Sequence, residues 1–207
     1  MDFNAIMELP AIGNTIASAI RSGSEWGEEF LNDPKWQGDK DRMAHHAIYE
    51  STLWSVGTGA ATGLGGGLVA VIGVPTDVGF TLYSQVKLAA TLFTIYGVNT
   101  NDKSAKPLIL AAAAGVGLSE LANTLGTSIG VQAIRSALMS IPGKVFAQIN
   151  KTLGIKLISK AGEKTLVNVA KMVPFLGGVV GGTVNGVMMN ACGHSTIAFI
   201  KALKQYK

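Results

Sequence analysis

Charged side chains are scarce in this chain of 207 residues. Asp, Glu, Lys and Arg make up 14% of it, whereas an ordinary soluble domain has roughly 25%. Hydrophobic residues reach 48%, and the mean hydropathy is +0.35. So few charges cannot easily cover a surface of this size. The composition therefore predicts either a large core or a surface that rests against lipid or a partner.

Cysteine is almost absent, and the signals of secretion are missing. The lone Cys192 excludes an internal disulfide and a metal site built from several cysteines, and its apolar surroundings predict a buried, inert thiol. The chain begins with Asp2 and Glu8 and has no Lys or Arg ahead of its first apolar side chains, so no secretory signal is predicted. We therefore expect a cytoplasmic protein.

Motifs for nucleic acids, cofactors and metals are absent as well. No helix-turn-helix, zinc-finger or RNP pattern occurs, and the cluster Gly63–Gly67 lacks the G-K-[ST] ending of a phosphate-binding loop. His46 and Glu50 stand four residues apart on a predicted helix and could share a ligand, but two such residues are too few for a metal site. We predict no nucleic-acid partner, no cofactor and no metal.

Lasting strand-like alternation is missing too, and helical signals take its place. The 26 glycines include Gly59, Gly63 and Gly67, and later Gly178, Gly182 and Gly186, each set at a spacing of four. Glycine costs a helix about 1 kcal/mol relative to alanine, so such stripes make sense where another backbone approaches closely. The sequence predicts an all-α fold, a compact bundle of Gly-rich apolar helices in one domain.

Two long stretches contain no charged residue. They cover Ser51–Thr76 and Val173–Ile200, and each is long enough to cross a bilayer. Glycine and threonine dilute their hydrophobicity, and a core helix packed on all sides has the same composition. Insertion into a membrane and burial in a compact domain both remain open. A third helix is predicted over Ala105–Met139 as a packing partner.

Charge is distributed unevenly along the chain. Residues 1–50 carry 9 acidic and 4 basic side chains, a net charge of −5, and residues 51–207 carry 4 acidic and 13 basic ones, a net charge of +9. We expect residues 1–44 to form an acidic, partly helical segment in which Pro34 interrupts the helix. The stretch Pro142–Met172 is amphipathic and cationic, and could meet anionic lipid headgroups through its lysines, among them Lys151, Lys156 and Lys160.

Three further patterns each allow two interpretations. Val74–Asp77 starts a helix, with Asp77 either capping it or facing a polar site. Gly126–Gly130 matches the G-x-S-x-G elbow of hydrolases, to which Glu163 and His194 could add a triad, but it lacks the strand that the elbow requires. The last predicted helix has one face that contains Asn185, Met189, Cys192 and Thr196. Its polar groups could form a hydrogen-bonded network in the interior, or they could form a ligand site.

The order of these pieces resembles the bacterial EcsC protein family over roughly residues 45–206. The resemblance rests on the glycine-rich helix, the Val-Pro-Thr-Asp turn, the helix that ends in Tyr96-Gly97, and the closing Pro/Gly-rich stretch followed by Asn: Gly59–Gly67, Val74–Asp77, Gln85, Val173–Gly181 and Asn185. It implies an all-helical domain over 45–207, associated with membranes or with membrane transport systems, and no established reaction. The family positions are Asp77, Gln85, Gly97, Gly181 and Asn185.

The expected function is binding of a lipid surface or of an apolar ligand at the inner face of a membrane, either peripherally or partly inserted. Possible partners are anionic membrane lipids and a membrane transport or secretion system. Two alternatives remain: a lipid-directed hydrolase or transferase that uses Asp77 and His194 as acid and base, and an effector in bacterial competition that inserts helices into a target membrane. The expected binding residues are Asp77, Gln85, Asn185, His194, Lys151, Lys156 and Lys160.

Overall fold

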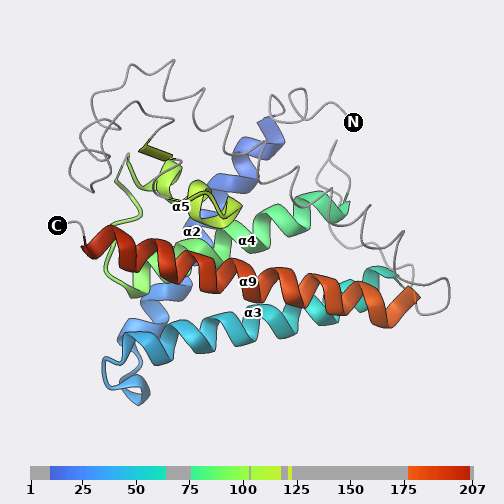
Figure 1. Ribbon diagram of the computed structural model, residues 1–207, viewed down its shortest axis with the longest axis horizontal. Coiled ribbons are helices and arrows are strands. Elements are labelled where there is room, and N and C mark those ends of the chain that lie inside the picture. The colour runs from blue at the N-terminus through green and yellow to red at the C-terminus, as the bar shows by residue number, and fades with distance from the viewer. Residues whose placement is uncertain (1–9, 64–75, 103, 118–120, 123–176, 206–207) are drawn as a thin grey trace.

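The computed structural model describes residues 10–63, 76–102, 104–117, 121–122 and 177–205 (Figure 1). These residues form five longer helices and one short 3-10 helix, and no strand occurs among them, which confirms the all-α prediction. The elements in chain order are α2 (Pro10–Asn32), η1 (Pro34–Trp36), α3 (Lys40–Gly63), α4 (Thr76–Ile95), α5 (Ala105–Ala114) and α9 (Gly177–Gln205).

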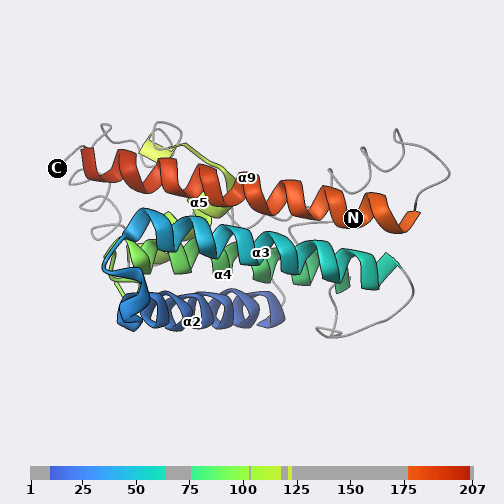
Figure 2. The same cartoon turned by 90° about the horizontal axis from the view of Figure 1, so that it is seen from below.

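Helix α4 lies in the middle and packs against α2, α3, α5 and α9. Helices α3 and α9 lie side by side and run in opposite directions, and α2 runs along the other side of α4 (Figure 2). The core is centred on α4, whose Leu88, Leu92, Phe93 and Ile95 are fully buried. Nearly every residue of α5 is buried as well, as expected for a helix that is apolar all round.

Close packing between α2 and α4 depends on two glycines. A methyl group at Gly23 would lie 2.3 Å from the carbonyl oxygen of Lys87, and one at Gly27 would lie 2.6 Å from Cβ of Thr94. Gly23 and Gly27 are four residues apart and share one face of α2, the arrangement that lets two helix backbones approach. The sequence analysis anticipated this use of glycine but did not single out this pair.

Glycines also form the contact between α9 and α3. A methyl group at Gly186 would meet Cγ2 of Val56 at 2.6 Å, and one at Gly193 would meet Cγ1 of Ile48 at 2.4 Å. Gly186, one glycine of a predicted stripe, therefore lies in this contact, where the nearest atoms of α3 belong to side chains. The other glycines of the two predicted stripes lie outside the residues whose side chains are described.

The described part of the acidic N-terminal segment, residues 10–44, contributes buried side chains to the core. Helix α2 ends before Pro34, as predicted, and Asp33 accepts a hydrogen bond from the backbone N–H of Lys35. Asp39 then caps α3 by accepting from the backbone N–H of Arg42 at 3.0 Å. Phe30 and Trp36 are buried, with their ring centroids 5.4 Å apart. Helix α3 runs without interruption across residues 44 and 45, the expected segment boundary.

The predicted helix over Ala105–Met139 is wrong in its extent, because α5 ends at Ala114. Gly115 has a φ of 69° in the left-handed region, which glycine adopts without strain. The backbone N–H of Val116 bonds back to the carbonyl oxygen of Ala111 at 2.8 Å, closing the helix end. The alanine-rich sequence continues a helical pattern, but this one glycine terminates it.

Within the described part of the chain, no helix combines the length and the apolar character needed to cross a membrane.

Candidate functional site

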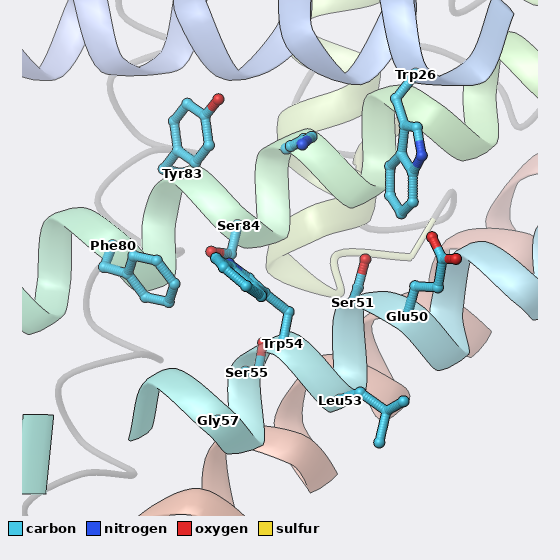
Figure 3. Close-up of a pocket in the computed structure, with 11 residues that line it drawn as sticks. Trp26, Glu50, Ser51, Leu53, Trp54, Ser55, Gly57, Phe80, Tyr83 and Ser84 are labelled. Carbon is cyan, nitrogen blue, oxygen red and sulfur yellow. The ribbon is translucent and has the colours of Figure 1, made fainter. Parts of the chain in front are cut away.

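A groove opens between α2, α3 and α4, with a volume of about 710 Å³ (Figure 3). Trp26 comes from α2, Trp54 from α3, and Phe80 and Tyr83 from α4. We call this site the aromatic groove, and the described residues of its wall are Trp26, Glu50, Ser51, Leu53, Trp54, Ser55, Gly57, Phe80, Tyr83, Ser84 and Lys87. Its volume lies within the range of roughly 300–1,000 Å³ that is usual for small-molecule sites.

Two tryptophans, Trp26 and Trp54, belong to the apolar wall of the groove. The indole of Trp54 extends from α3 toward Ser84 and Phe80 of α4. The indole of Trp26 projects from α2 toward Ser51 and Glu50 of α3 (Figure 3). Lys87 holds its ammonium 5.1 Å from the centroid of the Trp26 ring, a cation–π distance. Trp54 is 68% exposed, a large exposure for so apolar a side chain.

A second, smaller cavity of about 10 Å³ lies between α3, α4 and α9. It shares Ser55, Phe80 and Ser84 with the aromatic groove, so it lies directly beside the groove. We call it the polar chamber, and its wall is Ser55, Phe80, Thr81, Ser84, Gln85, Asn185, Met188 and Met189. Its volume is close to the smallest that holds one water molecule or one hydroxyl group.

Gln85 is the buried polar residue of the chamber. The residue is 3% exposed, and its Oε1 atom has no hydrogen-bond partner within the described part of the chain. An unsatisfied acceptor of this kind costs about 1–3 kcal/mol. Gln85 and Asn185 come from different helices and 100 residues apart in sequence, yet both line the same chamber. The structure thus brings together two of the residues that the family resemblance selected.

Asp77 and His194 are not brought together. Asp77 is the second residue of α4, and its side chain lies outside the described residues. Since α4 and α9 both run opposite to α3, they run in the same direction. Asp77 precedes Gln85 by eight residues, whereas His194 follows Asn185 by nine. At 1.5 Å per residue the two positions lie about 25 Å apart along the bundle.

His194 instead faces His45 of α3 across the α3–α9 contact. Their ring centroids are 5.5 Å apart, and both residues are exposed. His46 pairs with Glu50 along α3, with Nε2 2.9 Å from Oε1. Among the described residues, no three His, Cys, Asp or Glu side chains gather closely enough to hold a metal ion.

The face predicted on α9 points inward. Met189, Cys192 and Thr196 are buried, and Asn185 is half-buried. Sγ of Cys192 lies 3.7 Å from the carbonyl oxygen of Ala113 in α5. The prediction of a buried thiol is therefore confirmed, and of this face Asn185 and Met189 line the polar chamber.

Asp41, Tyr96 and Lys201 join the N-terminal segment to the rest of the bundle. The Tyr96 hydroxyl donates to Oδ1 of Asp41, and Nζ of Lys201 lies 3.0 Å from the same oxygen. The hydrogen bond from Tyr96, followed by that from Lys201, holds the pKa of Asp41 below its ordinary value of 3.8. Burial, and then the neighbouring Asp41 carboxylate, raise the pKa of Tyr96.

Several predicted binding elements lie outside the described residues. They are the lysines Lys151, Lys156 and Lys160, and the Gly126–Gly130 motif with Glu163. Gly181 belongs to α9, but its surroundings are not described.

Comparison with protein-family models, with curated proteins and with solved structures found no match. The resemblance to the EcsC family therefore stays a prediction.

The aromatic side chains of the groove were missed by the sequence analysis. Trp26, Trp54, Phe80 and Tyr83 come from three helices, and no spacing rule relates residues on different helices. One signal was available: Trp54 stands in the charge-free stretch after Glu50, where a large aromatic side chain is unusual beside so many small residues.

Proposed function

We propose that this protein binds an apolar, lipid-like ligand in the aromatic groove. The observation that carries the proposal is a cavity of about 710 Å³ whose wall includes two tryptophans, a phenylalanine and a tyrosine. Aromatic walls with a few polar groups are typical of small-molecule sites. Burying one Trp or Phe side chain against a ligand removes enough apolar surface to stabilise the complex by about 1.5–3 kcal/mol.

A membrane is the natural source of such a ligand. Tyr49, Leu53, Trp54 and Val56 are large apolar residues of α3 that remain exposed, and Leu53 and Trp54 also line the groove. We call these four residues the α3 patch. Trp and Tyr favour the boundary between water and lipid. The proposal is therefore a membrane-associated helical protein, related to the EcsC family, that works at the inner face of a membrane.

Anionic lipid is the proposed surface. In the same proposal, Lys151, Lys156 and Lys160 attract the headgroups, each near-surface lysine contributing about 1 kcal/mol. The separation of Asp77 and His194 along the bundle gives no support to the alternative of a lipid-directed enzyme that uses both as acid and base.

Binding of an uncharged fluorescent dye tests the groove. We expect N-phenyl-1-naphthylamine to bind the full chain and to quench its tryptophan emission by energy transfer. Trp54→Ala should weaken dye binding about tenfold, since it removes a wall of the groove. Because Trp54 is exposed, this change should leave the melting temperature nearly unchanged.

Val187→Ala is the matched control. Val187 is also exposed and apolar, at 65%, but it belongs to α9 and does not line the groove. Its removal should leave dye affinity unchanged. Equal dye affinity in the Trp54→Ala variant and the unchanged protein would contradict the proposal, as would a complete absence of dye binding.

A further inference from the structure

We infer that the ligand of the aromatic groove carries a hydroxyl group, which enters the polar chamber and donates a hydrogen bond to Gln85. This inference rests on the proposed function and specifies the ligand as an uncharged amphiphile, such as a long-chain alcohol or an acylglycerol. It follows from three features of the chamber: its position, its size and the chemistry of its wall.

The position comes first. Ser55, Phe80 and Ser84 belong to both cavities, so a ligand in the groove lies directly beside the chamber. Aromatic side chains line the groove, whereas Gln85 and Asn185 bring amide groups to the wall of the chamber alone. A molecule with an apolar body for the groove and one small polar end for these amides matches the two walls.

Size limits what the polar end can be. About 10 Å³ accommodates a group the size of water. A phosphate or a sugar is several times larger, so its entry would force α3, α4 and α9 apart. A single hydroxyl fits without moving the helices.

The wall excludes a charged group and favours a donor. None of the described residues that line the chamber carries a charge, and a buried ion without a partner is far more costly than a neutral group. Gln85 is only 3% exposed, and none of the described residues provides a hydrogen-bond partner for its acceptor atom Oε1. A hydroxyl hydrogen satisfies it, and its oxygen can accept in turn from a neighbouring hydroxyl or amide.

Displacement of the dye by paired ligands tests the inference. We compare 1-decanol with 1-methoxydecane, which has a similar chain and an ether oxygen but no hydrogen to donate. The alcohol should bind the full chain about tenfold more tightly than the ether. In the Gln85→Leu variant this ratio should fall to about one, through loss of alcohol affinity and with the ether unaffected.

Thermal unfolding provides a readout besides binding. Removing the unsatisfied acceptor in Gln85→Leu should raise the melting temperature of the ligand-free protein. Thr196→Val is the matched control, because Oγ1 of Thr196 is also buried, has no partner among the residues that the structure describes, and does not line the chamber. It should raise the melting temperature too, while keeping the alcohol-to-ether ratio of the unchanged protein. Gln85→Met serves if the leucine variant does not fold.

The outcomes separate the two proposals. Equal affinities for decanol and methoxydecane in the unchanged protein, with the dye bound, would overturn the hydroxyl and leave the apolar groove standing. A tenfold ratio that persists in Gln85→Leu and in Gln85→Met would equally overturn the role of Gln85. If neither the dye nor decanol binds, the proposed function itself fails.

Discussion

Asp41 of the N-terminal segment contacts the last helix through an ion pair and contacts Tyr96 through a hydrogen bond. Its Oδ1 accepts from Tyr96 and pairs with Lys201 at 3.0 Å. Because these contacts hold the pKa of Asp41 below 3.8, the folded state favours the carboxylate more than the unfolded chain does. The resulting stability is present above about pH 4 and is lost as the pH falls through the lowered pKa.

Tyr96→Phe tests this contact. At pH 7 it should lower the free energy of unfolding by about 1 kcal/mol, the usual contribution of one hydrogen bond, and the melting temperature by about 2–4 °C. The pKa of Asp41, followed by carbon-13 NMR of its carboxyl group, should move up toward its ordinary value. The stability difference between the two proteins should shrink when urea unfolding is repeated below pH 3. An unchanged Asp41 pKa in the variant would remove the basis for this account.

Helix contacts depend on a few glycines, and α2 offers an internal comparison. Gly23→Ala places a methyl group 2.3 Å from the carbonyl oxygen of Lys87, which is backbone and cannot easily yield. We expect it to lower the free energy of unfolding by about 1–3 kcal/mol. Gly13→Ala on the same helix meets nothing within 4 Å and should instead raise it by up to about 1 kcal/mol. Denaturant unfolding measures both, and equal effects would refute the close approach of α2 and α4.

The contact between α9 and α3 is testable by a double-mutant cycle. The methyl group of Gly193→Ala would collide with Ile48, whose Cγ1 and Cδ1 would lie 2.4 and 2.8 Å away. Ile48→Ala alone should cost about 2–5 kcal/mol, because Ile48 is buried and leaves a cavity. The double variant should cost clearly less than the two separate losses together, since the new methyl enters the vacated space. Additive losses would show that the residues do not touch.

Sequence was a good guide to elements and a poor one to the site. Pro34 identified where a helix ends, because that effect is local to the chain. The charge-free stretch that begins at Ser51 did not identify burial, since Leu53, Trp54 and Val56 are exposed. Gly115 was overlooked because an alanine-rich pattern continues past it, and the glycine becomes a helix end only by adopting a positive φ. Gln85 and Asn185 were selected, but the groove beside them requires three helices to be assembled first.

At the scale of the whole molecule, the α3 patch should contribute to membrane binding. We expect the full chain to float with vesicles that contain anionic phosphatidylglycerol. Leu53→Ser combined with Tyr49→Ser should reduce the bound fraction several-fold, because both side chains are exposed and apolar. Leu31→Ser, on α2, is the control and should float as before.

A high-salt wash of the same vesicles separates two contributions. Attraction between lysines and headgroups is screened by salt, whereas burial of the α3 patch is not. If the Tyr49→Ser/Leu53→Ser protein floats as fully as the unchanged protein after the wash, the α3 patch takes no part in binding.

The central claim is that the aromatic groove holds an apolar ligand, and the three tryptophans of the chain allow a direct measurement. Trp26 and Trp54 line the groove, whereas Trp36 does not and packs against Phe30 and His46. We would label the protein with 5-fluorotryptophan and titrate it with 1-decanol while recording fluorine NMR spectra. The account predicts that the resonances of Trp26 and Trp54 shift and saturate together while that of Trp36 stays in place. Unmoved Trp26 and Trp54 resonances at saturating decanol, or an equal shift of all three, would contradict it.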